Sequence, residues 1–560
     1  MTNIKFFRSL LMATVAFSVA GGAYAEDKQL LVLSEDVVAG LDYDGPSAAI
    51  PSSQQGMVTL LEPLVTYAKG KVNESGVQMP DFSKVEGALA ESWTYDATTF
   101  TWTLKLRHGV KGCGGATFNA DDVIYTFARA KSVSGAAPIG WFLSNVASIA
   151  GFTPDVFGKD PKAKELGDEV KKIDDYTVQI KQSEPNALFL PVLSIFGLLI
   201  FDKETMMAHA TPDDPWSHNY VNNENAPGFG AYCLDTWKKG EEISFKANPD
   251  YYRGAPAIQH VSIRRVPQSS NRLVVLRTGQ AQLVTGLTPK EFSSLQKADG
   301  LHVGGVIGNE NLFIHMNFKT KPFDNPKIRE AISYAVPYDQ IIKTGYFGEA
   351  TKWNGVVPSS YPGYVPSATP TKYDPKKAKA LLAEAGYPDG KGLEAFGDAF
   401  QLSYVAEKES TLGPIVNILQ SALRNVGIPA TLNPIPQTQY GDRMLVKGDL
   451  PFAVNDHEKP IGVDAGYATQ LFFVTKSKGG LNNMVNYSNT KVDDLWSKAR
   501  VEPDPAKRNA MLADIQQQII SDVAWLPVVE YKTQWAYSDK LEGMRWYPDN
   551  SIRFSELKLK

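Results

Sequence analysis

The chain has 560 residues, of which 43% are hydrophobic and 21% are charged, a balance typical of globular proteins with more than one compact core. The formal net charge of −4, with no long run of lysine or arginine, argues against a nucleic-acid-binding surface. Only two cysteines are present, Cys113 and Cys233, which excludes a multi-cysteine zinc ribbon, a ferredoxin-type iron–sulfur site and a disulfide-dense miniature fold.

The first 25 residues have the pattern of an export signal. Lys5 and Arg8 precede an apolar run over 10–20, and residues 23–25 read Ala-Tyr-Ala, the small-x-small pattern of a signal-peptidase site. We therefore expect the mature protein to begin at Glu26 and its net charge to change from −4 to −6, because Lys5 and Arg8 are lost. The apolar run is too short to span a bilayer, and no cysteine stands at the cleavage site to carry a lipid. The sequence predicts an unanchored protein of the periplasm.

The first half of the mature chain is predicted to be rich in strands. Phe100, Trp102, Leu104 and Leu106 alternate with polar residues, which predicts a strand over 99–107 with these four side chains on one face. Asn119 is expected to cap a helix that has two acids in its first turn. The other predicted elements are a buried strand over 29–34, a helix capped by Ser52 or Ser53 and ending at Leu61, a strand over 176–181, and a hairpin of strands 230–237 and 242–247.

Strands and helices alternate in the second half, which predicts an α/β lobe of its own. The predicted strands are 312–318, 400–406, 430–435 and 525–530, and the predicted helices are 326–335, 374–385, 412–426 and 438–446. No low-complexity linker separates this part from the first half, so we expect any boundary to lie in a strand that crosses from one lobe to the other.

No catalytic or metal-binding motif stands out. The sequence has no G-x-S-x-G elbow, no Walker lysine loop and no H-E-x-x-H, and Gly228-Phe-Gly230 lacks the third glycine of a dinucleotide fingerprint. His209 and His218 lie near Asp213 and Asp214, but this spacing matches no usual metal site and favours a solvated loop. We expect no metal and no cofactor. A carboxylate pair or a triad assembled in space stays open as an alternative.

Several motifs together resemble the peptide-type extracellular solute-binding proteins, family 5, of ABC transporters. The resemblance covers about 29–550 in the order of the family. The motifs that carry it are Leu89–Trp93, Leu104–Val110, Phe118–Val123, Asn248–Tyr252 and Tyr373–Gly386, with further matches at Glu62–Leu64, Gly228–Tyr232, Pro322–Phe323, Ile328–Ala335 and Asn486–Ser488.

The resemblance implies an α/β fold, the two-lobed clam of periplasmic binding proteins of class II type, with a ligand cleft between the lobes. After the signal peptide 1–25, an enlarged lobe I would take 26–308, with an extra subdomain near 57–190. Lobe II would take 309–525, and 526–560 would return to lobe I. Crossing segments near 308–312 and 522–528 would form the hinge.

The implied function is capture of a small solute, a peptide or a peptide-like compound, by closure of the two lobes, without catalysis. A monomeric protein would deliver the solute to an inner-membrane ABC permease. An opine, an oligosaccharide or a metal chelate is the alternative ligand class, and a secreted hydrolase is the alternative outside this family.

The family resemblance places the ligand's anchor in a loop after a lobe II strand, where Asp456 is the nearest acid to the expected position. Glu458 and Asp464 are the next choices. Aromatic rings beside glycine or proline could line the cleft, although packing under loops is the alternative for each of them. The predicted ligand-binding residues are Glu35, Trp353, Tyr361, Tyr440, Asn455, Asp456, His457 and Tyr467.

The same resemblance places Cys113 and Cys233 in lobe I, and an exported protein meets oxidising conditions. We therefore expect a disulfide between them that closes a loop of about 120 residues. Two separately buried thiols are the alternative.

Overall fold

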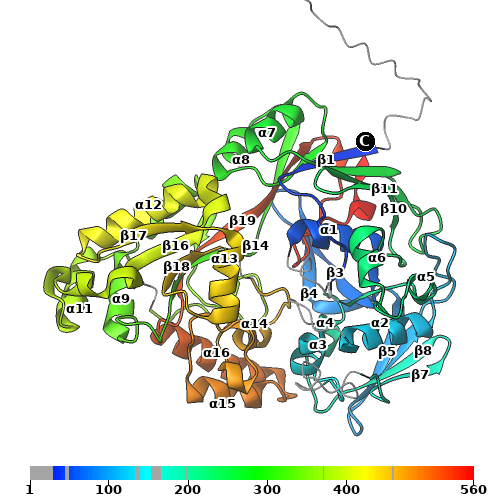
Figure 1. The fold of residues 1–560 in the computed structure, drawn as a ribbon, viewed down its shortest axis with the longest axis horizontal. Coiled ribbons are helices and arrows are strands. Elements are labelled where there is room, and N and C mark those ends of the chain that lie inside the picture. Colours follow the sequence, from blue (N-terminus) through cyan, green and yellow to red (C-terminus); the bar gives the residue numbers. More distant parts are fainter. Residues whose placement is uncertain are drawn as a thin grey trace, which may run out of the picture.

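The computed structural model describes residues 29–43, 50–132, 139–152, 165–195, 198–369, 371–456 and 459–560. The predicted signal segment 1–25, His457 and Glu458 lie outside the described residues. Two lobes lie side by side (Figure 1), lobe I with both ends of the described chain and lobe II with its middle. Among the described helices, none is long and apolar enough to cross a membrane.

One large sheet runs through both lobes. Its strand order is β10-β11-β12-β1-β13-β19-β14-β18-β16-β17, and β15 pairs with β19. Its strands are β10 (Tyr232–Lys238), β11 (Glu242–Ala247), β12 (His260–Arg265), β1 (Gln29–Ser34), β13 (Leu283–Val284), β19 (Leu526–Ser538), β14 (Leu301–Met316), β18 (Phe452–Asn455), β16 (Gln401–Val405), β17 (Thr431–Ile435) and β15 (Ala350–Lys352).

The long antiparallel strands β14 and β19 join the two halves of this sheet (Figure 1). The ladder between them skips three residues of β14, because Ile307 pairs with Lys532 and the next pair is Asn311 with Glu530. Gly308 lies in this break, and a Cβ atom there would come within 2.5 Å of the Trp546 ring. Glycine is therefore required for the close approach of the indole to the strand.

Parallel strands flank the two crossing strands. In lobe I, β1 pairs in parallel with β12 and β13, and in lobe II, β16 pairs in parallel with β17 and β18. The helices that follow these strands are α7 (Ser269–Arg277) and α8 (Pro289–Leu295) in lobe I, and α12 (Glu409–Asn425) and α13 (Gln437–Gly441) in lobe II. The segments after β1, β12, β13, β16 and β18 face one another across the molecule, because they line one common cavity.

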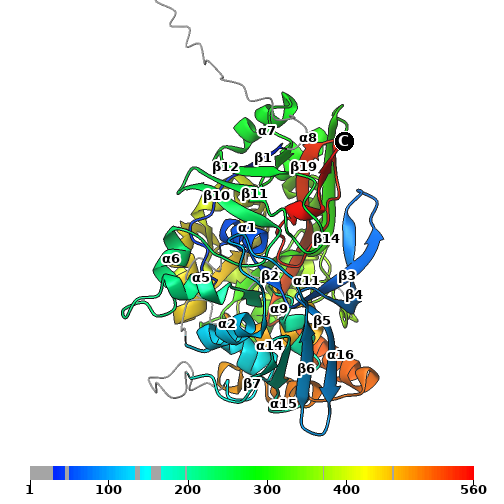
Figure 2. The ribbon, with the colours of Figure 1, turned by 90° about the vertical axis from the view of Figure 1, so that its right-hand side faces the viewer.

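Lobe I carries additional strands outside the large sheet. They form a hairpin of β3 (Val65–Val72) and β4 (Gln78–Gly87), a sheet of β5 (Ala90–Asp96), β6 (Thr101–Leu106), β8 (Thr177–Lys181) and β7 (Val170–Asp174), and the pair β2 (Glu62–Pro63) with β9 (Leu199–Ile200). In Figure 2, β3 and β4 lie at the right and β5, β6 and β7 lie at the bottom. The C-terminal strands β20 (Leu541–Glu542) and β21 (Lys558–Leu559) pair with each other. The remaining lobe I helices are α1 (Pro51–Leu60), α2 (Ala120–Ser132), α3 (Ile139–Trp141), α4 (Phe189–Val192), α5 (Lys203–Ala208) and α6 (His218–Asn223).

Two local predictions in lobe I are wrong. Helix α1 has Ile50 at its N-cap and Pro51 at its first position, so neither Ser52 nor Ser53 caps it. The Ser53 hydroxyl instead accepts hydrogen bonds from the Ala39 and Gly40 amides. Phe100 has a φ of 56° in the turn before β6, which removes it from the face shared by Trp102, Leu104 and Leu106.

Some lobe II helices pack on a second core formed with β14, β16, β18 and β19, whereas the buried residues of α13 and of the helices over 465–521 belong to the larger core shared with lobe I. Its helices are α9 (Pro326–Ala335), α10 (Tyr338–Gln340), α11 (Pro375–Glu384), α14 (Ala465–Phe472), α15 (Thr490–Ala499) and α16 (Pro505–Ser521), besides α12 and α13. The predicted helix over 438–446 is split, because α13 continues as a π-helical turn from Asp442 to Lys447.

Cys113, which follows β6, and Cys233 of β10 are joined by a disulfide with Cα atoms 5.6 Å apart. The bond ties the loop after β6 to the edge strand of the large sheet. Both cysteines therefore lie on the lobe I side of the molecule.

Candidate functional site

A cavity of about 310 Å³ lies between the lobes, and we call it the cleft cavity. Its lobe I wall follows the ends of β1, β12 and β13, with Glu35, Ser269 and Thr288 among its residues. Its lobe II wall follows the ends of β16 and β18, with Lys408 and Asp456. Ligands of open α/β sheets bind in the crevice outside the carboxyl ends of parallel strands. The topology therefore makes this cavity a candidate binding site.

Charged side chains of both signs line the cleft cavity. Lys408 donates hydrogen bonds of 2.9 and 3.0 Å to the two carboxylate oxygens of Asp456. Lys532 pairs with Glu349 at 2.7 Å. Glu35 is exposed, and it interacts electrostatically with Arg272, which lines the same cavity. The cavity thus presents two ion pairs and the carboxylates of Glu35 and Glu407 to a bound molecule.

Arg272 also lines the cleft cavity, but its guanidinium is used within lobe I. It is 1% exposed and donates hydrogen bonds to the carbonyl oxygens of Val266, Pro267 and Gly286. Burial lowers the pKa of Arg272, although Glu35 opposes that shift. Arg272 therefore fastens the segments that follow β12 and β13, which form part of the cavity wall.

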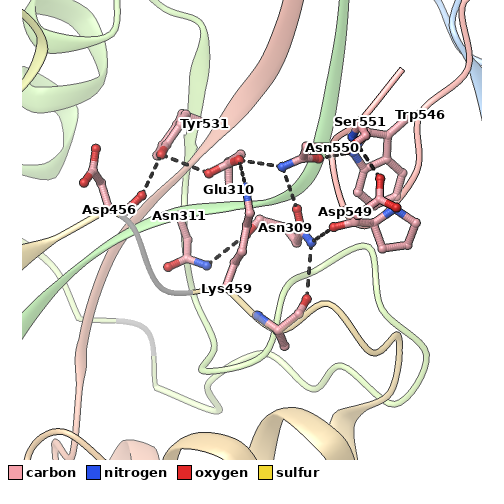
Figure 3. A network of polar contacts seen from close by, with 12 residues as sticks. Asn309, Glu310, Asn311, Asp456, Lys459, Tyr531, Trp546, Asp549, Asn550 and Ser551 are labelled. Atoms are coloured by element: carbon pink, nitrogen blue, oxygen red, sulfur yellow. Dashed lines mark hydrogen bonds and ion pairs between the residues drawn. The ribbon is translucent and has the colours of Figure 1, made fainter. Parts of the chain in front are cut away.

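Asp456 is connected to the break in β14 through Tyr531 of β19 (Figure 3). The Tyr531 hydroxyl lies 3.1 Å from the Asp456 carbonyl oxygen and 3.1 Å from a carboxylate oxygen of Glu310. Burial, and then the carboxylates of Glu310 and Asp456, raise the pKa of Tyr531 well above its usual range. The phenol stays protonated and can donate to either oxygen.

Glu310 is held ionised by its surroundings. Burial favours the neutral acid, but the ion pair and hydrogen bond with Lys459 outweigh burial and hold the pKa of Glu310 below its usual value. The Asn550 amide donates a second hydrogen bond, of 2.5 Å, to the same carboxylate. Residues from both lobes therefore meet at this one side chain.

Two of the predicted aromatic residues lie away from the cleft cavity. Trp353 is buried, donates to the Val357 carbonyl oxygen at 3.0 Å and lines a cavity of only about 40 Å³ within lobe II. Tyr361 is buried, accepts a hydrogen bond from the Asn309 amide at 2.9 Å and donates to the Pro460 carbonyl oxygen. Both rings pack in the core, which is the alternative that the sequence left open.

Three further predicted residues are also buried. The Tyr440 hydroxyl donates to the Val454 carbonyl oxygen at 2.8 Å, and the Asn455 amide lies 3.0 Å from the Met444 sulfur, so both residues hold β18 in place. Tyr467 of α14 stacks on Phe142 of lobe I with 6.2 Å between ring centroids. Of the eight predicted residues, Glu35 and Asp456 line the cleft cavity, and His457 lies outside the described residues.

Asp464, a second choice for the anchor, has a structural role. Its carboxylate accepts hydrogen bonds from the Gly466 and Tyr467 amides at the start of α14. It also pairs with Arg508 of α16 through two hydrogen bonds of 2.6 and 2.9 Å. Because these contacts use both carboxylate oxygens, Asp464 serves the α14–α16 packing.

Sequence reasoning missed Lys408, Lys532, Glu349 and Glu310. Lys408 follows the predicted strand 400–406, just as Glu35 follows the predicted strand 29–34, so its place at the end of a strand is a signal that could have found it. Lys532 lies within β19 and Glu349 precedes β15, and their role depends on pairing across the sheet. No local pattern marks such residues.

The lobes also touch at the far side of the molecule from α7 and α8 (Figure 1). Arg500 of α15 lies 2.5 Å from Glu184 and 2.8 Å from the Ser148 hydroxyl, both in lobe I. The Gln470 amide donates to the Asn145 carbonyl oxygen at 2.9 Å. These contacts join α14 and α15 of lobe II directly to lobe I.

A second cavity of about 310 Å³ lies mostly within lobe I, and Ile461 is its one described lobe II residue. Its Glu62 accepts hydrogen bonds from Tyr251 and Tyr252, and burial raises the pKa of Glu62. Because the cleft cavity draws on both lobes while this one belongs largely to one, we take the cleft cavity as the candidate site. No group of three or more His, Cys, Asp or Glu among the described residues is placed to hold a metal ion.

Comparisons with known proteins agree with this architecture. Residues 84–479 match the model of the bacterial extracellular solute-binding proteins, family 5. The glutathione-binding protein GsiB of Shigella dysenteriae is 28% identical over 481 residues, which cover 85% of this chain and 86% of that protein.

Two solved structures share the fold. The periplasmic binding protein DppA from Helicobacter pylori, in complex with the peptide STSA, has a TM-score of 0.75 at 24% identity, covering 95% of this chain and 98% of that one. The binding protein MoaA from A. tumefaciens R10, in complex with mannopinic acid, has a TM-score of 0.76 at 24% identity, covering 95% and 100% of the two chains. Both are two-lobed proteins, so the predicted fold class is confirmed.

Proposed function

Because the chain belongs to the bacterial extracellular solute-binding proteins of family 5, the solute-binding components of ABC importers, we propose that its ligand is a short peptide with a free ammonium and a free carboxylate group. The observation that carries this proposal is the charge pattern of the cleft cavity. Glu35 approaches from lobe I, and Asp456 and Lys408 approach from lobe II.

A peptide of this kind would meet an opposite charge at each end. Its ammonium group would bind Glu35 or Asp456, and its carboxylate would bind Lys408 or Lys532, through charge-assisted hydrogen bonds. Contacts from both lobes favour the closed state by the difference in the ligand's affinity for the closed and open states. Two of the relatives support a peptide, since GsiB is a glutathione-binding protein and the DppA structure contains a peptide.

The proposal extends to where the protein acts and which partner receives its ligand. Export through the cleavable segment 1–25 would release an unanchored, monomeric protein into the periplasm, where it delivers its ligand unchanged to an inner-membrane ABC permease. We place the lobe boundaries at 308–309 and 525–526, and the break in β14 supports the first of these. No covalent step is needed for this function.

A ligand screen by scanning fluorimetry and calorimetry tests the proposal. The probes are glutathione, trialanine, mannopinic acid, an oligosaccharide and Fe(III)-EDTA, each followed for chemical change. A peptide present at 100 times its Kd should add about 2.7 kcal/mol to the free energy of unfolding. Stabilisation by mannopinic acid, the sugar or the chelate alone would overturn the peptide assignment, and release of a reaction product would overturn the binding role.

A further inference from the structure

The break in β14 brings together segments of both lobes. Because the ladder with β19 skips Gly308, Asn309 and Glu310, these residues are outside the regular pairing. The side chains of Asn309 and Glu310 point instead toward loops on the two sides of the strand (Figure 3). A bulge that turns side chains out of a ladder is a common feature next to functional sites.

Asn309 binds both lobes with one amide group. Its nitrogen lies 2.7 Å from the Pro548 carbonyl oxygen in lobe I, 3.2 Å from the Pro460 carbonyl oxygen in lobe II and 2.9 Å from the Tyr361 hydroxyl. An amide has two hydrogens, so the three acceptors share two donated bonds. Asn309 is 1% exposed, and removing it would leave buried acceptors without a donor.

Glu310 also contacts both lobes, through a charged side chain. Its carboxylate pairs with Lys459, which follows β18 in lobe II, and accepts a hydrogen bond from Asn550 of lobe I. The Trp546 indole N–H donates to the side-chain oxygen Oδ1 of Asn550 at 2.6 Å and so fixes that side-chain amide. The Glu310 side chain is 17% exposed, which reduces screening of its ion pair by solvent.

We propose that Asn309 and Glu310 are positioning residues for ligand capture. They hold Asp456, Lys459 and Pro460 of lobe II against Pro548 and Asn550 of lobe I, and so set both the place of Asp456 in the cleft cavity and the extent of lobe closure. Tyr531 completes the connection, because its hydroxyl bridges Glu310 and the Asp456 backbone. The inference rests on the proposed function in one respect, that Asp456 faces the ligand.

This role predicts a particular pattern of binding. The observed Kd equals the intrinsic Kd divided by the fraction of molecules in the closed state. A variant that destabilises the closed state therefore raises the observed Kd of every ligand by the same factor, chiefly through faster dissociation. A residue that touches the ligand would instead change the ratio of affinities between two ligands.

Asn309→Ala tests the role, and Asn317→Ala is its matched control. Asn317 is also an asparagine that is 1% exposed, and it directly follows β14. Its amide donates to the Gly448 and Leu450 carbonyl oxygens, which both lie in lobe II. The two variants thus lose similar buried hydrogen bonds, but only Asn309→Ala loses bonds that connect the lobes.

We expect Asn309→Ala to increase the radius of gyration of the unliganded protein in small-angle X-ray scattering. Glutathione and trialanine should both dissociate about tenfold faster, with the ratio of their affinities unchanged within about twofold. Glu310→Gln keeps the shape of the side chain and loses its charge. It should also increase the radius of gyration and the dissociation rates, but by less than Asn309→Ala does. Asn317→Ala should lower Tm and leave the radius of gyration and the dissociation rates unchanged. Equal scattering and dissociation rates for Asn309→Ala and Asn317→Ala would overturn the proposal.

The experiment stays decisive if the wild-type protein binds neither peptide or if Asn309→Ala does not fold. If neither peptide binds the wild-type protein, the proposed ligand class is wrong, while the scattering of the unliganded variants still decides the positioning role. If Asn309→Ala does not fold, Asn550→Ala replaces it, since Asn550 is half-buried and supplies the lobe I contact of Glu310. An unchanged radius of gyration in folded Asn550→Ala would then overturn the proposal.

Discussion

Glu35 and Asp456 come from opposite lobes and line the same cavity. Glu35 directly follows β1 and Asp456 directly follows β18, so each stands at the carboxyl end of a strand that has a parallel neighbour. Their shared cavity exists because β14 and β19 join the two half-sheets edge to edge. A ligand held by both carboxylates would be bound by both lobes.

Asp456→Asn should weaken the binding of a peptide with a free ammonium group by about 2–5 kcal/mol, because it removes a largely buried charge partner. Isothermal titration calorimetry measures the change. Asp449→Asn is the control, since Asp449 is half-exposed and pairs with Arg443 at the surface. An unchanged Kd in Asp456→Asn would mean that Asp456 serves only as the partner of Lys408.

Reduction of the Cys113–Cys233 disulfide should lower the free energy of unfolding by about 4 kcal/mol, because the bond closes a loop with a sequence separation of 120 residues. Urea titration of the wild-type protein and of a Cys113→Ser/Cys233→Ser double variant checks the value. Thiol counting on denatured, unreduced protein should find no free thiol. Two free thiols would contradict the bond.

His315 should make stability depend on pH. It is 0% exposed in β14, with Nε2 2.8 Å from the Leu450 carbonyl oxygen, and burial lowers its pKa to about 4. Between pH 6.5 and 4 the unfolded chain binds a proton at this residue and the folded chain does not, so the free energy of unfolding falls as pH is lowered. The stabilisation is complete above pH 6.5, and about 3 kcal/mol is lost by pH 4.

Urea titrations at pH 7.5, 6.0 and 5.0 test this for the wild-type protein and for His315→Gln. The difference between the two proteins isolates His315 from the carboxylates, which also titrate at low pH. We expect the wild-type protein to lose more stability than the variant over this range. Parallel pH profiles would show that His315 does not cause the dependence.

Asp464→Ala should destabilise the protein by about 3 kcal/mol and leave ligand affinity unchanged. The substitution removes the cap of α14 and leaves the largely buried Arg508 without its carboxylate. Chemical denaturation gives the stability, and calorimetry on the folded variant gives the affinity. A selective loss of peptide binding at wild-type stability would instead identify Asp464 as an anchor.

Local patterns predicted the elements whose borders have strong local signals. Gln29–Ser34 is an apolar run followed by two acids, and Pro326–Ala335 begins with proline behind the capping Asn325, so both predictions agree with the structure. The strand predicted to begin at Leu312 in fact begins at Leu301. Its first part is rich in glycine and does not alternate, and its pairing with β19 comes from distant sequence.

The candidate site was predicted only in part, for a related reason. Glu35 was predicted because it follows a strand that can be read from the sequence, and Asp456 was predicted because the family resemblance implies an acidic anchor in its loop. Trp353 and Tyr361 were selected as rings beside glycine or proline, but such rings pack under loops as readily as they line a cleft. Glu310 was missed, because its environment is created by a break in a ladder between strands far apart in the chain.

Calorimetric titration of the wild-type protein with trialanine, N-acetyltrialanine and trialanine amide measures what each charged end of a peptide contributes to binding. If the cleft cavity binds both charged ends of a short peptide, trialanine should bind, and either modification should raise Kd by about 100-fold, or 2.7 kcal/mol. Equal affinities for the three compounds, or no binding of trialanine and glutathione alongside tight binding of mannopinic acid, would show that the cleft cavity does not bind a peptide in this way.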